Sequence, residues 1–312
     1  MKTENRLFWL DNIKGLAIIL VVLGHCLIDI DNKQYLKILV QFIYVFHMPL
    51  FFILSGISFN LTKSKTKRIY IIKNILCIYV IQSLIYICLN CIIRHYLPLN
   101  SDVSWEDIMY LPIKPVAHFW YLFSLIIFYF VCISIQNMKA IMIMLSFLLL
   151  LASQFVSLDY VSKVLFMFFF FYVGSIRIDS FIKNIRWVIY LICCIAWMLL
   201  AFKHGISCSI LVIYGAIIFS FTIINYFEYK LYFRLKLLVY LGQNSIWIYI
   251  FHSYFTSFSR AICSKIGIEI IEIKIIICSL LGIIGPILIK KLLEKIQLEK
   301  IVTKPIEYIK LF

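Results

Sequence analysis

Apolar runs of about 20 residues recur along almost the whole chain, and they constrain its fold more than any other feature. A bilayer core about 30 Å thick requires about 20 helical residues to cross it. The 312 residues are 63% hydrophobic and only 14% charged, whereas a soluble domain averages about 25% charged residues. This composition excludes a water-soluble globular protein, because no compact domain of this size can bury so much apolar surface. It also excludes a disordered chain and a small disulfide scaffold.

The runs predict an all-α fold, a polytopic integral membrane helical bundle with about ten transmembrane helices. The predicted spans are 12–30, 39–60, 69–93, 118–136, 140–157, 161–178, 186–203, 206–226, 237–257 and 270–290. Eight spans with two re-entrant segments fit the same runs. Because the sequence shows no repeat and no linker, residues 1–312 are predicted to form a single membrane domain. The tail from about residue 291 is predicted to be an amphipathic cytoplasmic helix.

The basic residues predict the orientation of these helices. The formal net charge is +15, but Lys and Arg cluster between apolar runs, which is typical of membrane loops and argues against nucleic acid as a partner. With the N-terminus inside, about two thirds of the 30 Lys and Arg residues fall on the inner side. Both termini are therefore predicted to be cytoplasmic, in a multi-pass protein of the cell (inner or plasma) membrane. The ten cysteines show no spacing that predicts a metal site.

Polar residues inside membrane spans are costly and usually functional, and the first span holds the richest set. Lys14 and His25 are eleven residues apart, which on a helix is about three turns and a rise of about 16 Å. Both therefore lie on one stripe, with Lys14 near the inner boundary and His25 deep in the bilayer. Asp11 can pair with Lys14 across one turn. His25 is either a general base, since His exchanges protons near neutral pH, or a hydrogen-bonding group between helices.

Two stretches of the chain resemble the membrane acyltransferase family 3. They are RLFWLDNIKGLAIILVVLGH, which ends at His25, and FHMPLFFILSG, which begins at Phe46. Within the family, the sequence is most similar to the fucose 4-O-acetylase-like sugar O-acetyltransferases. The resemblance continues in Lys67-Arg68, in His118-Phe-Trp120-Tyr-Leu and in the segment 241–252. The family's essential basic residue, followed by ten residues and a His, corresponds here to Lys14 and His25. Where many members carry Arg-x-Arg, this chain has Lys65-Thr-Lys67-Arg68.

The resemblance implies an O-acetyltransferase that moves an acetyl group from cytoplasmic acetyl-CoA to a hydroxyl of a cell-surface, capsular or lipid-linked sugar. His25 would be the general base or an acyl relay, with Lys14 and Asp11 beside it. Lys14, Lys67 and Arg68 would bind the phosphates of the acyl-CoA co-substrate, for which Arg has the better geometry. The partners implied are therefore an acyl-CoA, a glycan or lipid-linked sugar, and the lipid bilayer.

Polar and aromatic residues of the predicted outer halves would bind the sugar. The candidates on that side are His47, Trp120, Tyr249 and His252, together with Asp29 and Asp31 after the first span. Asn244 is a further candidate for substrate binding. Each has an alternative role. His47 fits a polar cap equally well, Trp120 fits the aromatic belt at the membrane interface, and Asn244 fits a hydrogen bond between helices.

Two other functions fit the same spans. The same fold could transfer succinyl or another acyl group, although a larger, anionic acyl group should need a cation deep among the helices, and the sequence places no Lys or Arg there. A glycan transporter or flippase belongs to a different class of protein. Such a protein often shows inverted repeats, and the sequence contains no convincing repeat.

Overall fold

The computed structural model describes residues 8–27, 33–93, 103–135, 139–177, 187–205, 209–229, 231 and 234–309. Every regular element within these residues is helical, which confirms the all-α prediction for this part of the chain. Six helices are long and apolar enough to cross a membrane by length and composition. Each predicted span overlaps a helix, but the count of ten spans stays a prediction. Asp29 and Asp31 lie outside the described residues.

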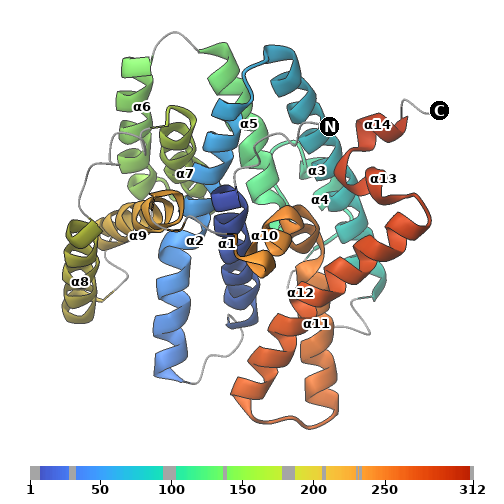
Figure 1. Ribbon diagram of the computed structural model, residues 1–312. Coiled ribbons are helices and arrows are strands. Elements are labelled where there is room, and N and C mark those ends of the chain that lie inside the picture. Colours follow the sequence, from blue (N-terminus) through green and yellow to red (C-terminus); the bar gives the residue numbers. More distant parts are fainter. Residues whose placement is uncertain are drawn as a thin grey trace. The chain divides into compact units, whose positions relative to one another are not determined.

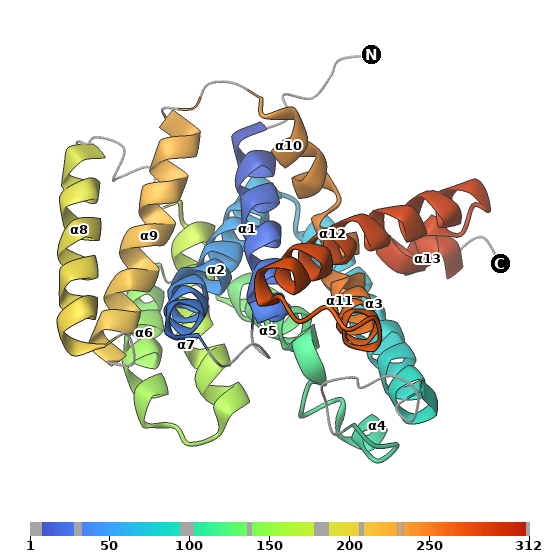
Figure 2. The same cartoon turned by 90° about the horizontal axis from the view of Figure 1, so that it is seen from below.

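The chain forms two compact units, each described by itself below. Unit 1 comprises residues 1–61 and 138–245, and unit 2 comprises residues 62–137 and 246–312. The helices of unit 1 are α1 (Phe8–Leu27), α2 (Gln34–Leu61), α6 (Lys139–Ala152), the short 3-10 helix η2 (Ser153–Phe155), α7 (Asp159–Ser175), α8 (Trp187–His204), α9 (Ser209–Tyr229) and α10 (Lys236–Gln243). Within this unit, α8 lies beside α9 in both ribbon views (Figures 1 and 2).

Glycines bring the helices of unit 1 into backbone contact. A Cβ atom built on Gly15 of α1 would overlap the Leu238 carbonyl of α10, and one built on Gly242 would overlap the Asp11 carbonyl. Gly56 of α2 and Gly174 of α7 form a second reciprocal contact of this kind. Small residues are the usual means of close helix packing in membranes. The first pair holds the N-terminal half of α1 tightly against α10.

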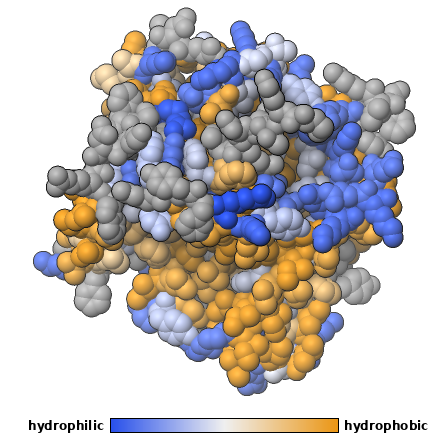
Figure 3. Space-filling view, viewed as in Figure 1, coloured by the Kyte–Doolittle hydropathy of each residue, from blue (hydrophilic) through white to orange (hydrophobic). Residues whose placement is uncertain are grey.

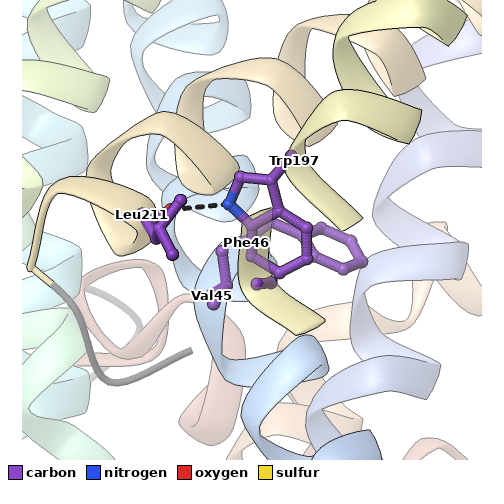
Figure 4. Packing of buried hydrophobic residues seen from close by; sticks show 5 residues of the cluster. Val45, Phe46, Trp197 and Leu211 are labelled. Carbon is purple, nitrogen blue, oxygen red and sulfur yellow. Dashed lines mark hydrogen bonds between the residues drawn. The ribbon is translucent and has the colours of Figure 1, made fainter. Parts of the chain in front are cut away.

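A tryptophan organises the packing of α8 and α9 against α2. Trp197 is 1% exposed and packs with Val45 and Phe46 of α2 and with Leu211 of α9. Its indole Nε1 donates a hydrogen bond of 2.7 Å to the Leu211 carbonyl (Figure 4). A buried indole needs such an acceptor for its N–H, so the position of Trp197 is fixed both by packing and by this bond.

Unit 2 is built on a long helix with the C-terminal helices beside it. Its helices are α3 (Lys65–Ile93), α4 (Asp107–Tyr110), the 3-10 helix η1 (Ala117–Phe119), α5 (Trp120–Ser134), α11 (Ser245–Lys265, from Ile246 in this unit), α12 (Ile271–Lys295), α13 (Glu299–Thr303) and α14 (Pro305–Ile309). The hydroxyl of Tyr79 in α3 donates to the Leu111 carbonyl at 2.7 Å. At the other end of α3, Tyr70 donates to Glu307 of α14. A hydrogen bond from Lys304 lowers the pKa of the Glu307 carboxyl.

Unit 2 also exposes a broad apolar surface. Ile276, Leu280 and Leu288 of α12 are each more than half exposed. The space-filling view shows hydrophobic residues gathered where α11 and α12 lie, with hydrophilic residues above them (Figure 3). A soluble protein rarely exposes apolar patches of this extent. Contact with lipid accounts for this surface in a membrane protein.

Two predicted boundaries differ from the structure. The predicted span 237–257 is broken at Asn244, where α10 ends and α11 begins one residue later. The predicted tail helix from about residue 291 is wrong as a single element. The last span continues as α12 to Lys295, and two five-residue helices, α13 and α14, follow it.

Candidate functional site

Helix α1 carries the three residues that the sequence places at the centre of the site. Asp11, Lys14 and His25 all lie in this one continuous helix, as the spacing predicts. Asp11 is buried, and Lys14 and His25 are each partly buried. Regular helix geometry places Lys14 and His25 on one stripe with a rise of about 16 Å between them. The site therefore extends along the helix and is not a single cluster.

The N-terminal end of this stripe is held by residues from two other helices of unit 1. The ammonium Nζ of Lys14 donates a hydrogen bond of 3.3 Å to the hydroxyl of Ser58 on α2. The side-chain amide of Gln243, the last residue of α10, donates at 3.3 Å to the Asp11 carboxylate. Lys14 thus contacts α2 and Asp11 contacts α10, and the pairing of the two side chains with each other stays a prediction. Ser58 and Gln243 were not among the predicted site residues.

Two arginines add positive charge near the first turn of α1. The guanidinium of Arg177 lies 5.7 Å from the ring centre of Trp9, and that of Arg234 lies 5.1 Å from the ring centre of Phe8. Arg177 also forms an ion pair of 2.6 Å with Glu228 of α9. Arg177 has a φ of +58°, which is uncommon for a residue other than glycine. In the sequence, both arginines served only to predict the orientation of the helices in the membrane.

A second histidine lies near the far end of the stripe. A Cβ atom built on Gly24 would come within 3.0 Å of the Tyr44 ring of α2, so this glycine permits the close approach beside His25. The Tyr44 ring in turn packs edge-on against His47, with ring centres 4.8 Å apart. His47 is buried, and its Nδ1 bonds the Ile43 carbonyl at 2.7 Å. Because a carbonyl only accepts, Nδ1 carries the proton and Nε2 has the lone pair.

The predicted basic cluster before the third span lies in unit 2. Lys67 is exposed in the first turn of α3. Arg68 is partly buried, and its Nε donates at 2.6 Å to the Thr62 carbonyl. This bond ties Arg68 to the loop between α2 and α3. The binding of a donor phosphate by Lys67 and Arg68 stays a prediction.

Unit 2 contains a buried cluster of histidines and tyrosines. The rings of His118 on η1 and His252 on α11 have centres 5.0 Å apart, and His118 also packs against Tyr249 and against Tyr86 of α3. The hydroxyl of Tyr249 donates to the His118 carbonyl. The structure thus brings together two predicted sugar-binding residues, Tyr249 and His252. It adds His118, whose signal in the sequence was a polar residue at the start of an apolar run.

The remaining two candidates lie at helix ends. Trp120 is the first residue of α5 and is partly buried. Asn244 is 2% exposed at the break between α10 and α11, and its side-chain amide donates at 2.7 Å to the Tyr240 carbonyl. This hydrogen bond to the last turn of α10 explains why the helix ends before Asn244. A role for either residue in sugar binding stays a prediction. Among the described residues, no group of three His, Cys, Asp or Glu side chains is arranged to hold a metal ion.

These features define the class of the protein. Long apolar helices, an apolar outer surface and a polar stripe along a buried helix are those of a multi-pass membrane protein. A family model described as "Acyltransferase domain" matches residues 7–290. The chain therefore belongs to this family, the membrane acyltransferase family 3. Comparison with curated proteins and with solved structures gives no match.

Proposed function

We propose that this acyltransferase moves an acetyl group from cytoplasmic acetyl-CoA to a hydroxyl of a cell-surface, capsular or lipid-linked sugar. The observation that carries the proposal is the stripe on α1, where Lys14 and His25 share one helix inside unit 1. Ionisable residues are rare in membrane spans unless they serve a function. In an acyltransferase, the function that they best fit is the binding of an anionic donor and the activation of a hydroxyl.

The separation of the two residues suggests different roles for them. A rise of about 16 Å is too long for both side chains to contact the same carbonyl group. Acyl-CoA has its phosphates at one end and its thioester at the other, joined by the long pantetheine arm. We assign the phosphate end to the neighbourhood of Lys14, with Arg177 and Arg234 nearby, since cations bind phosphates by charge-assisted hydrogen bonds. The thioester then lies toward His25.

His25 would act on the acceptor hydroxyl. As a general base, its unprotonated ring nitrogen takes the hydroxyl proton while the sugar oxygen attacks the thioester carbonyl. The tetrahedral intermediate then collapses, the C–S bond breaks, and the proton passes to the CoA thiolate. As an acyl relay, the same nitrogen would attack the thioester carbonyl, the C–S bond would break and the CoA thiolate would leave. The acetyl-imidazolium would then pass the acetyl group to the sugar hydroxyl, whose proton goes to the thiolate. Both routes need the His25 nitrogen lone pair.

Within unit 1, His47 would contact the acceptor sugar. The cluster of His118, Tyr249 and His252 is a separate candidate for sugar binding within unit 2. Neutral imidazoles and phenols both donate and accept hydrogen bonds, and aromatic rings cover the apolar faces of sugars. The buried state of these residues favours a selective site, because a buried polar group left without its partner is costly.

Membranes from cells with and without the protein provide the direct test. They are incubated with acetyl-CoA labelled in the acetyl group, and the glycan and lipid fractions are separated and analysed by mass spectrometry. The proposal expects a new O-acetyl ester on a sugar only when the protein is present. Labelled succinyl-CoA serves as the matched control. Transfer of succinyl but not acetyl, or no transfer of either group, would contradict the proposal.

A further inference from the structure

A second polar stripe lies on α3, within unit 2. This helix is long and apolar enough to cross a membrane, yet polar side chains recur every three to four residues on one face, at Tyr79, Gln82-Ser83, Tyr86 and Asn90. Each of the five is at most 5% exposed. Buried polar side chains in a membrane helix are costly and usually have a function. This α3 stripe is distinct from the one on α1, which belongs to unit 1.

Three oxygen atoms of the α3 stripe lack a hydrogen bond within the part of the chain that the structure describes. The Tyr79 hydroxyl is satisfied, because it donates to the Leu111 carbonyl at 2.7 Å. The amide oxygens of Gln82 and Asn90 and the hydroxyl of Ser83 are buried but have no such partner among the described residues. About 90% or more of buried polar groups in proteins have one. Three exceptions on one helix face therefore indicate that a group from outside the chain supplies the missing bonds.

The ring of Tyr86 connects the α3 stripe to the cluster of histidines and tyrosines. Its centre lies 6.0 Å from that of His118 and 5.6 Å from that of Tyr254 on α11. Gln82 and Ser83 lie one turn before Tyr86 on the same face of α3. The hydroxyl of Tyr254 is a fourth buried group without a hydrogen-bond partner among the described residues. Two helices that pack through Tyr86 thus carry all four groups.

The chemistry of the four groups restricts what can satisfy them. An amide oxygen only accepts hydrogen bonds, so the partners of Gln82 and Asn90 must donate a proton. The two hydroxyls can accept as well. A hydrocarbon chain, an ether and an ester offer no proton, whereas an alcohol does. The neighbouring rings of Tyr86, His118 and Tyr254 provide apolar surface between the polar contacts. The set is complementary to a compound with several free hydroxyls.

We propose that these four groups bind hydroxyls of the acceptor within unit 2, and that the two amide oxygens select hydroxyls that are unmodified. This inference rests on the proposed function and gives α3 a part in recognising the acceptor. A hydroxyl that is already acetylated or methylated has no proton to donate. It would leave a buried amide oxygen without a partner, which is costly, so such a compound should bind poorly.

Stability and acetyl transfer, measured on the same variants, distinguish binding residues from structural ones. Ser83→Ala and Tyr254→Phe each remove one hydroxyl, and Gln82→Met removes the amide at similar volume. Because these groups lack a partner in the free protein, their loss should leave the thermal midpoint in detergent unchanged or raise it. Transfer of labelled acetyl to membrane glycan should nevertheless fall at least about tenfold in each variant.

The matched controls remove hydroxyls that are bonded within the protein. Tyr79→Phe corresponds to Tyr254→Phe and should lower the midpoint, since the Tyr79 hydroxyl bonds the Leu111 carbonyl. Ser124→Ala corresponds to Ser83→Ala, because Ser124 is equally buried but donates to the Trp120 carbonyl. Both controls should transfer acetyl at the wild-type rate. A lowered midpoint with undiminished transfer in Ser83→Ala and Gln82→Met would show a structural role, filled by ordered water, and would overturn the proposal.

Binding without acetyl transfer separates this proposal from the proposed function. The probe is glycan from the same cells, treated with mild base to remove O-acetyl esters. It should raise the thermal midpoint of the wild type and of Tyr79→Phe but not of Gln82→Met, and the same glycan after permethylation should raise none. No rise in the wild type, or an equal rise in Gln82→Met, would overturn the proposal and leave the acetyltransferase intact. If the wild type transfers no acetyl group but the rise depends on Gln82, the proposed function fails and the hydroxyl-binding site stands.

Discussion

Lys14 differs in its environment from a lysine that only sets the orientation of the chain. A topological lysine extends into water, whereas the ammonium of Lys14 bonds the Ser58 hydroxyl on a neighbouring helix. The Asp11 carboxylate, one turn away, is bonded by Gln243. Such contacts fix the direction of the charge, as the binding of a phosphate requires.

Lys14→Met should therefore impair the binding of the donor more than the chemical step. A charge-assisted hydrogen bond is worth about 1.5–3 kcal/mol, so the KM for acetyl-CoA should rise roughly 10- to 100-fold, with a smaller fall in kcat. Lys14→Arg should retain most of the affinity. Ser58→Ala is the matched control, because it removes the hydrogen bond to Lys14 but keeps the charge. It should change the KM for acetyl-CoA by less than about fivefold. An unchanged KM in Lys14→Met, with kcat alone reduced, would place Lys14 at the reacting carbonyl instead.

Part of this residue-level description was predictable from the sequence. The helical stripe of Lys14 and His25 follows from a spacing within one element, and the structure confirms the helix. Ser58 and Gln243 did not follow, because they lie 44 and 232 positions from their partners along the chain. Nothing local marks a serine in an apolar span as the neighbour of a particular lysine. His118 was missed for the same reason, since its partners lie on α3 and α11.

At the scale of elements, the close pairs of helices depend on glycine. Gly56 and Gly174 bring α2 and α7 together, and a Cβ atom on either would overlap backbone of the other helix. The sequence alone could not name α7 as the helix that packs against Gly56. It also predicted one span over 237–257, although Gln243, Asn244 and Ser245 interrupt the apolar run. The break depends on one residue, Asn244, whose amide bonds the last turn of α10.

Gly56→Val should destabilise the protein by about 1–3 kcal/mol, because the added methyl groups meet backbone that cannot move aside. The thermal midpoint in detergent should fall by several degrees. Gly24→Ala is the matched control. Its new Cβ atom meets only side chains. The tightest contact is with Tyr44, which is 39% exposed and can shift, and Ile43 lies at an ordinary contact distance. Equal midpoints for Gly56→Val and the wild type would show that α2 and α7 are not in backbone contact.

At the scale of the whole molecule, hydropathy and charge predict most of what the described residues can test. Each predicted span overlaps a helix, and six helices meet the length and composition needed to cross a membrane. The division into two units was not predicted, because each unit joins segments that are far apart in the sequence. A continuous series of apolar runs carries no signal for which of them pack together.

The predicted orientation can be tested by cysteine labelling. In a background without the ten native cysteines, Lys37→Cys should react with a membrane-impermeant maleimide in intact cells, because it is predicted to lie outside. Lys65→Cys and Lys304→Cys should react only after permeabilisation. All three positions are exposed, so burial does not keep the maleimide from reaching them. Labelling of Lys65→Cys in intact cells would reverse the orientation and place the donor site on the wrong side for cytoplasmic acetyl-CoA.

The central claim is that the side chain of His25 carries out acyl transfer, and one measurement tests it most directly. Wild type, His25→Gln and Leu23→Ala, a control at a partly buried position of the same helix, are incorporated into membranes at equal levels, and transfer from labelled acetyl-CoA is followed over time. Gln retains hydrogen-bonding capacity but has no lone pair that accepts a proton near neutral pH. The account predicts at least a roughly 100-fold loss of transfer in His25→Gln, with the wild-type rate in Leu23→Ala and undiminished insertion of all three. Transfer by His25→Gln at the wild-type rate would contradict it.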